Sequence, residues 1–161
     1  MLRRYLENYI RNDLKEKMVF ISGPRQVGKT TLARQTGERF FQDRYEYLNW
    51  DFAEDRKKIL AGIWEADGDL FILDEIHKYK KWKGYLKGVF DKFAERFSIL
   101  VTGSARLDIY RKGGDSLLGR YRSYRLHPLS VAEIDTPDAS AGKIFSPFRE
   151  FDGKLFHHPL L

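Results

Sequence analysis

The chain has 161 residues, 42% of them hydrophobic, which is enough for one ordinary domain with a single core. It contains no cysteine, which excludes disulfides and thiolate metal sites, and its four histidines lack the paired spacing typical of zinc ligation. The formal net charge of +6 permits binding to nucleic acid, to an acidic membrane or to a polyphosphate, and it does not choose among them.

Location and domain limits follow from the distribution of apolar and charged residues. No stretch approaches the roughly 18 consecutive apolar residues of a membrane helix, and the opening MLRRYLENYIRNDLKEK is too charged for a signal peptide. We therefore expect a cytoplasmic protein without membrane contact. The regular pattern ends near Thr136, so we expect a core at residues 1–135 and a short tail at 136–161 that is not a domain of its own.

The first part of the chain alternates between helical and extended patterns. Apolar spacing predicts an amphipathic lead helix at residues 2–16, and the apolar run Met18–Ile21 predicts the first strand. A glycine-rich loop follows, then a predicted helix at Thr30–Phe40 and a second strand at Tyr45–Trp50. Strands that alternate with helices in this way imply right-handed crossovers and a parallel sheet.

Another helix is predicted after the second strand. Asp51 and Glu54 have the spacing of a capping box at its start. Its apolar face is predicted to consist of Phe52, Ile59, Leu60 and Ile63. The next strand, Leu70–Leu73, is wholly apolar, as expected where both faces of a parallel sheet are covered.

The strongest helical pattern lies in residues 82–97, where apolar residues recur at spacings of three and four. Strands are predicted at Ile99–Val101 and Tyr121–Leu126. Ser130 and Glu133 then have capping-box spacing and predict a short helix. We therefore expect an α/β sandwich of about five strands.

The segment GPRQVGKT, which begins at Gly23, fits the pattern G-x-x-x-x-G-K-[ST] between a strand and a helix. Glycines there let successive backbone N–H groups surround a phosphate, and the helix N-terminus favours negative charge. Lys29 would add a positive charge at the β- and γ-phosphates, and the Thr30 hydroxyl would bind Mg²⁺. We predict that a nucleoside triphosphate contacts Gly23, Pro24, Arg25, Gln26, Val27, Gly28, Lys29, Thr30 and Thr31.

Hydrolysis needs a metal anchor and a base, and the third strand ends in candidates for both. Asp74 follows four apolar residues, which places it at the C-terminal edge of the sheet, where open α/β folds bind their ligands. We expect Asp74 to hold Mg²⁺ through its bound waters. Glu75 would orient and deprotonate the attacking water. Alternatively, Asp74 and Glu75 have neither role and only form an exposed acidic turn.

The fourth and fifth strands add candidates whose roles stay open. Thr102 and Ser104 follow the fourth strand and would sense the γ-phosphate or hold the water, or else Ser104 only caps a helix at residues 105–110. Arg120 is the preferred candidate for an arginine finger, a side chain that neutralises negative charge in the transition state. The reason is that Gly119 before it would let the chain move as Arg120 approaches the nucleotide. The other finger candidates are Arg106, Arg122 and Arg125, and each of the four arginines has a surface role as its alternative.

These segments together resemble the archaeal and bacterial AAA-type ATPases. The motifs of that family stand here, within residues 2–134, as GPRQVGKTTL, LDEIHK, VTGSAR, SLLGR and YRLHPLSVAEI. The resemblance implies a P-loop NTPase three-layer sandwich with the sheet order 5-1-4-3-2, and ATP as the nucleotide. By this resemblance Lys29, Thr30, Asp74 and Glu75 take the phosphate, Mg²⁺ and water-activating roles. Thr102 or Ser104 resembles the sensor position, and Arg120 lies in the SL-x-GR segment of the family.

Two features depart from the family. His77 stands where the family often has Gln, and we interpret it as a surface histidine. Chains of the family usually continue through a lid into a C-terminal domain, whereas this one ends at Leu161, so we interpret it as a short form. The tail phenylalanines Phe145, Phe148, Phe151 and Phe156 would cover a sheet edge, or contact a second copy or another protein.

Three functions are compatible with these residues. The first is Mg²⁺-dependent ATP hydrolysis that drives or gates a regulatory assembly. The second is a nucleotide-dependent binding module with negligible turnover. The third is a small P-loop kinase. Six lysines in residues 78–92 form a solvated face or else follow a nucleic-acid backbone.

Overall fold

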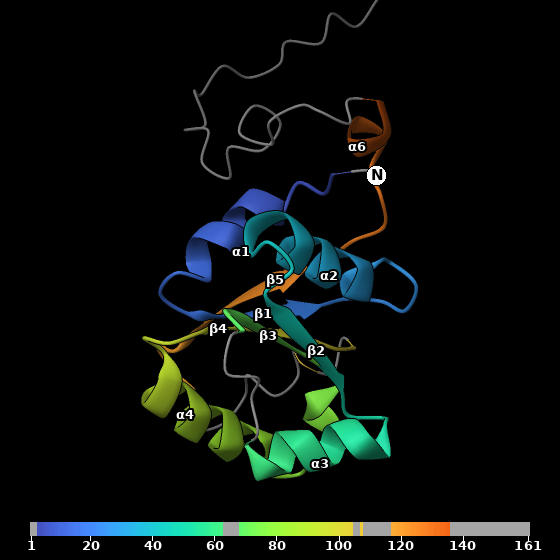
Figure 1. Ribbon diagram of the computed structural model, residues 1–161. Helices are drawn as coiled ribbons and strands as arrows, with labels where there is room; N and C mark the ends of the chain where they lie inside the picture. Colours follow the sequence, from blue (N-terminus) through green and yellow to red (C-terminus); the bar gives the residue numbers. More distant parts are fainter. Residues whose placement is uncertain (1–2, 63–67, 105–106, 108–116, 136–161) are drawn as a thin grey trace, which may run out of the picture.

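The computed structural model describes residues 3–62, 68–104, 107 and 117–135. In this part of the chain a β-sheet lies between two layers of helices (Figure 1). Helices α1 (Glu7–Asp13) and α2 (Lys29–Phe40) cover one face, and α3 (Ala53–Ala61) and α4 (Trp82–Phe93) cover the other. None of the described helices combines the length and the apolar character needed to cross a membrane.

The sheet has five strands in the order β2-β3-β4-β1-β5, and every neighbouring pair is parallel. The strands are β1 (Met18–Ser22), β2 (Tyr45–Asn49), β3 (Leu70–Asp74), β4 (Ser98–Thr102) and β5 (Tyr121–Arg125). This is the expected order 5-1-4-3-2 read from the opposite edge, so the predicted fold class is confirmed. A 3₁₀ helix, η1 (Ile76–Lys78), follows β3, and α6 (Val131–Asp135) follows β5.

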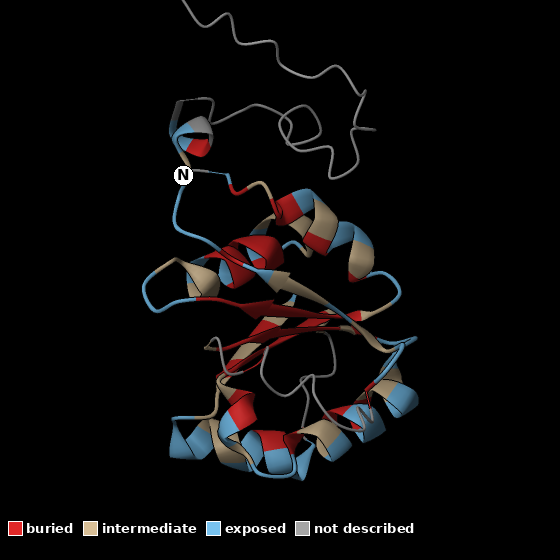
Figure 2. Ribbon diagram, turned by 180° about the vertical axis from the view of Figure 1, so that it is seen from behind, coloured by how far each residue is buried: buried red, intermediate tan, exposed pale blue. Residues whose placement is uncertain are grey.

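The core lies on both faces of the central strands (Figure 2). All residues of β1 and β3 are buried, as their apolar runs predict. Ile10 of α1 and Leu32 of α2 belong to the core cluster on one face, and Ile59 of α3 and Leu86 of α4 to the cluster on the other. Strand β5 forms an edge, and its residues are only half-buried or exposed.

The start of α3 differs from the prediction. In the described structure its N-cap is Phe52, which makes no side-chain cap, so the capping box at Asp51 and Glu54 is wrong. Instead the Asp55 carboxylate accepts a hydrogen bond from the Asn49 backbone N–H at 2.8 Å. The carboxylate of Asp55, one residue after Glu54, therefore binds the backbone that precedes the helix.

The apolar face predicted for α3 is also mostly wrong. Ile59 is fully buried, but Phe52 is 62% exposed and Leu60 is 51% exposed. Ile63 lies outside the described residues, as do Arg106, most of the helix expected at 105–110 and the tail at 136–161.

The lead helix is shorter than expected, whereas the last capping box is confirmed. Helix α1 begins at Glu7, because before it Arg4 and Tyr5 both bind the distant Glu133 carboxylate. The Ser130 N–H donates to Glu133 Oε2 at 2.9 Å, and the Glu133 N–H donates to Ser130 Oγ at 3.3 Å.

Leu100→Ala should destabilise the fold strongly, because Leu100 lies fully buried on the central strand β4. Truncation removes buried methyl groups and leaves a cavity, so the free energy of unfolding should fall by about 2 to 5 kcal/mol. The matched change Leu60→Ala, at an exposed position of α3, should alter it by less than about 0.5 kcal/mol. Urea unfolding measures both values, and equal effects would contradict the placement of Leu100 in the core.

Candidate nucleotide-binding site

The loop between β1 and α2 requires glycine at two positions. Gly23 (φ +147°) and Gly28 (φ +89°) have backbone conformations that L side chains rarely adopt. A Cβ atom at Gly23 would come within 2.3 Å of the Leu126 carbonyl oxygen, so the loop packs directly on the end of β5. Helix α2 begins immediately after the loop, at Lys29, and the N–H groups of its first turn therefore adjoin it.

The Lys29 ammonium lies against the same loop. It donates hydrogen bonds to the carbonyl oxygens of Gly23 at 3.1 Å and Pro24 at 2.6 Å. Burial lowers the pKa of Lys29, and the carboxylates of Glu75 and Asp74 oppose this shift. The structure thus brings the lysine charge to the loop and close to both acidic candidates. Of the other predicted loop contacts, Pro24, Arg25, Gln26 and Thr31 are exposed and Val27 is half-buried.

Asp74, the last residue of β3, is the centre of the site. It is only 6% exposed. Its Oδ2 accepts hydrogen bonds from the hydroxyls of Thr30 at 2.9 Å and Tyr47 at 2.7 Å, and its Oδ1 accepts one from Thr102 at 2.6 Å. The parallel register makes this meeting possible, because Asp74 pairs with Asn49 on β2 and with Thr102 on β4.

Tyr47 is a member of the site that the sequence pattern does not predict. It lies on β2, and its closeness to Asp74 becomes visible only when the register of β2 and β3 is known. Burial and the hydrogen bond to Asp74 raise the pKa of Tyr47 to about 12, so its hydroxyl keeps its proton and remains a donor. The Arg34 guanidinium covers the ring, 4.1 Å from its centroid.

Glu75 follows Asp74 with a left-handed φ of +58°, which is uncommon for a residue other than glycine. Its carboxylate forms an ion pair with Lys78 at 3.3 Å and lies 3.7 Å from His77 Nε2. Its backbone N–H donates to the Thr102 carbonyl at 2.9 Å. The Glu75 side chain is 23% exposed, whereas the whole Asp74 residue is only 6% exposed.

His77 is buried, so its interpretation as a surface histidine is wrong. A Cβ atom at Gly103 would come within 2.7 Å of His77 Nδ1, so the ring packs on the backbone that follows β4. His77 Nε2 lies 3.3 Å from Ser104 Oγ. The imidazole therefore lies between Ser104 and Glu75, and the predicted sensor and base share one neighbour.

Arg120 is not brought to this site within the chain. It precedes β5 at the amino edge of the sheet, where its carbonyl accepts a hydrogen bond from the Met18 N–H at 2.9 Å. Its guanidinium binds Asp91 of α4 through two hydrogen bonds, at 2.6 and 3.1 Å. The phosphate loop lies at the opposite, carboxyl edge. Arg122 and Arg125 are exposed on β5.

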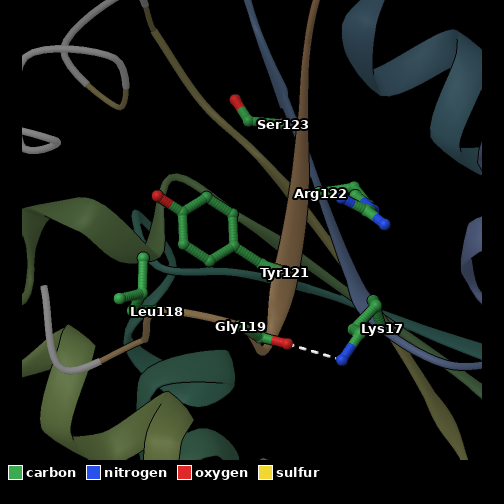
Figure 3. Close-up of a pocket in the computed structure, with 6 residues that line it drawn as sticks. All are labelled: Lys17, Leu118, Gly119, Tyr121, Arg122 and Ser123. Carbon is green, nitrogen blue, oxygen red and sulfur yellow. Dashed lines mark hydrogen bonds between the residues drawn. The ribbon is translucent and has the colours of Figure 1, made fainter.

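A cavity of about 550 Å³ lies at this amino edge, and Gly119 and Tyr121, the sequence neighbours of Arg120, are among its lining residues. Figure 3 shows Lys17 and Arg122 on one side of β5 and Tyr121 on the other. The Lys17 ammonium donates to the Gly119 carbonyl at 2.6 Å. Leu118, Gly119 and Ser123 complete the lining. The cavity therefore lies apart from the carboxylates and the phosphate loop.

Known structures share this fold. The AMPPCP-bound DnaA from Aquifex aeolicus has a TM-score of 0.54 and 17% identity, over 76% of this chain and 44% of that one. The Thermotoga maritima RuvB Holliday junction branch migration motor has a TM-score of 0.53 and 20% identity, over 78% of this chain and 45% of that one. At such identities the likeness shows the fold alone.

Two curated relatives match in sequence, an uncharacterized protein of Mycobacterium bovis and one of Mycobacterium tuberculosis. Each is 28% identical over 125 residues, which is 76% of this chain and 27% of the relative. The chain thus spans about a quarter of the length of the curated relatives it matches. The family model of the AAA domain matches residues 15–135, a stretch that contains the phosphate loop and both carboxylates, and the chain therefore belongs to the AAA domain family.

Proposed function

We propose that this chain binds ATP with Mg²⁺ at residues 23–31 and hydrolyses it, and that this cycle drives or gates a regulatory assembly. The main support is the meeting of Thr30 and Asp74 at 2.9 Å beside the phosphate loop, with Glu75 next to them. Membership of the AAA domain family supports nucleotide binding and hydrolysis in general.

The oxygen donors at this edge suit Mg²⁺. The Thr30 hydroxyl and the Asp74 carboxylate are hard ligands of the kind that Mg²⁺ prefers. The described residues contain no group of three or more His, Cys, Asp or Glu side chains that could hold a metal, and a Mg²⁺ ion on a nucleotide needs none, because phosphates and water supply its other ligands. When bound, the ion would neutralise charge on the β- and γ-phosphates.

The proposed roles divide among the loop, the base and the residues that sense the nucleotide. Loop N–H groups and Lys29 hold the β- and γ-phosphates. Glu75 accepts a proton from water as the water oxygen attacks the γ-phosphorus, and the bond to the bridging oxygen breaks to leave ADP and phosphate. Thr102, which donates a hydrogen bond to Asp74, and Ser104, which lies beside His77, are the proposed sensors of the γ-phosphate.

A second function, a nucleotide-dependent binding module with negligible turnover, is favoured by the contacts of Glu75. Glu75 pairs with Lys78, which also binds Asp51 at 2.6 Å, and we infer that this ion pair weakens Glu75 as a base. A nucleic-acid partner would meet the exposed lysines Lys80, Lys81, Lys87 and Lys92. Phosphate release measured with and without DNA or RNA distinguishes the two functions.

Lys29→Ala should weaken nucleotide binding, because it removes the charged donor at the phosphate loop. The Kd for AMPPCP with Mg²⁺ should rise roughly 10- to 100-fold, as expected for the loss of one charge-assisted hydrogen bond. Isothermal titration calorimetry measures this Kd. Lys57→Ala, on the exposed side of α3, is the matched control and should bind as the wild type does. Tight binding by Lys29→Ala would rule out the assigned site.

Glu75→Gln should abolish turnover while nucleotide binding is kept, because glutamine has the shape of glutamate but cannot accept the proton. Steady-state phosphate release should fall roughly 100-fold or more. Glu54→Gln, at an exposed position of α3, is the control. Unchanged phosphate release by Glu75→Gln would show that another group is the base.

Arg120 should act on a nucleotide held by another copy of the chain, since it lies at the far edge of its own sheet. Arg120→Ala and Glu75→Gln should each be inactive alone, whereas an equimolar mixture should regain activity, because an intact Arg120 of one variant then meets an intact Glu75 of the other. Phosphate release and the mass in solution test this together. Full activity of Arg120→Ala alone, or an inactive mixture that assembles, would exclude the role.

A further inference from the structure

Arg4 is a buried arginine just before α1 that neither the predicted site nor the proposed reaction includes. Its side chain is 7% exposed and makes hydrogen bonds with all three guanidinium nitrogens. Nε donates to Glu133 Oε1 at 2.9 Å, Nη1 to the Val27 carbonyl at 2.9 Å, and Nη2 to the His127 carbonyl at 2.6 Å. These partners belong to the start of α6, the phosphate loop and the turn after β5, so one guanidinium joins three separate segments.

The bond to Val27 bears directly on the phosphate loop. None of the described peptide bonds is cis, so the Val27 carbonyl and the Gly28 N–H of the same peptide plane point in opposite directions. Holding the carbonyl toward Arg4 therefore holds the Gly28 N–H away from Arg4. A Cβ atom at Gly28 would lie 3.6 Å from Arg4 Nη1, so the guanidinium packs closely beside this peptide.

Glu133 keeps the guanidinium in place and balances its charge. Its carboxylate also accepts hydrogen bonds from the Ser130 N–H at 2.9 Å, the Ser130 hydroxyl at 3.0 Å and the Tyr5 N–H at 3.1 Å. Burial by itself would raise the pKa of Glu133, but the hydrogen bonds from Ser130, Arg4 and Tyr5 lower it below its usual value. Because the ionised Glu133 neutralises Arg4, the contact orients a peptide rather than adding net charge at the phosphate.

The segment that carries Arg4 is also attached to the helix behind the loop. The Arg4 backbone N–H donates to Glu7 Oε1 at 3.1 Å, and Glu7 accepts hydrogen bonds from Arg39 of α2 at 2.7 and 2.9 Å. Figure 1 shows the N-terminal segment beside α6, although the two are far apart in the sequence. The loop and its helix are thus held from one side by residues from both ends of the described chain.

We propose that Arg4 is a positioning residue for the phosphate loop. Through the Val27 carbonyl it directs the Gly28 N–H to the phosphate. Its bonds to Glu133 and the His127 carbonyl make this orientation depend on the docking of residues 127–133. This role rests on the proposed nucleotide function of the loop. It also makes nucleotide affinity sensitive to any partner that moves residues 127–133.

Arg4→Ala and Arg4→Lys test the role, with Arg3→Ala as the exposed neighbouring control. The probes are AMPPCP and inorganic tripolyphosphate, each with Mg²⁺, at a temperature where circular dichroism shows every variant folded. Arg4→Ala should lose affinity for both probes by the same factor, about tenfold or more, because the lost contact concerns the phosphate alone. Arg4→Lys should lose nearly as much, since an ammonium lacks the planar fork that binds three acceptors. Arg3→Ala should bind as the wild type does.

A second measurement needs no nucleotide and separates this inference from the proposed function. The ¹⁵N order parameter of Gly28 in the ligand-free protein should fall in Arg4→Ala and stay unchanged in Arg3→Ala. Wild-type protein that binds neither probe would refute the proposed function, and the Gly28 measurement would still decide the role of Arg4. Wild-type affinity in folded Arg4→Ala or Arg4→Lys, or an unchanged Gly28 order parameter in Arg4→Ala, would overturn the inference.

Discussion

The buried carboxylate of Asp74 is the constraint around which this site is organised. A carboxylate that is almost fully buried is tolerated only when hydrogen bonds satisfy it, and the hydroxyls of Thr30, Tyr47 and Thr102 do so. Each hydroxyl comes from a different element, respectively α2, β2 and β4, so the carboxylate connects all three to β3. The stability of this edge and the meeting of Thr30, Tyr47, Asp74 and Thr102 therefore depend on the same contacts.

The phosphate loop, in contrast, is shaped by contacts from outside itself. Gly23 lies against the Leu126 carbonyl, and the Val27 carbonyl is bound by Arg4, while Pro24, Arg25 and Gln26 are exposed. Because the loop has little packing of its own, its conformation is set by the end of β5 and by the segment before α1. If the loop binds nucleotide as proposed, the docking of these two segments and nucleotide binding should be linked, since both would favour the same loop geometry.

Local patterns predicted the elements better than their ends. The apolar runs of β1 and β3 identify buried strands, because a strand covered on both faces has no polar side. The capping box was predicted correctly at Ser130 and wrongly at Asp51. At the second place the Asp51 N–H donates to Asn49 Oδ1 and the Asp51 carboxylate binds Lys78, and a spacing rule does not reveal such partners. His77 is buried for a related reason, since the absence of a side chain at Gly103 admits its ring.

Local sequence patterns predict the fold class, which the structure confirms, and they also predict the phosphate loop and the two acidic residues, because periodicity, glycine placement and strand ends involve only neighbouring residues. The motif resemblance added the strand order. Which side chains meet depends on the folded chain. Tyr47 reaches Asp74 through the register of two strands, and Arg4 reaches Glu133 because both ends of the described core lie beside the loop. Arg120, in contrast, lies at the opposite edge of the sheet. Such contacts depend on strand register and on the path of the chain, and motifs of a few neighbouring residues contain no information about either.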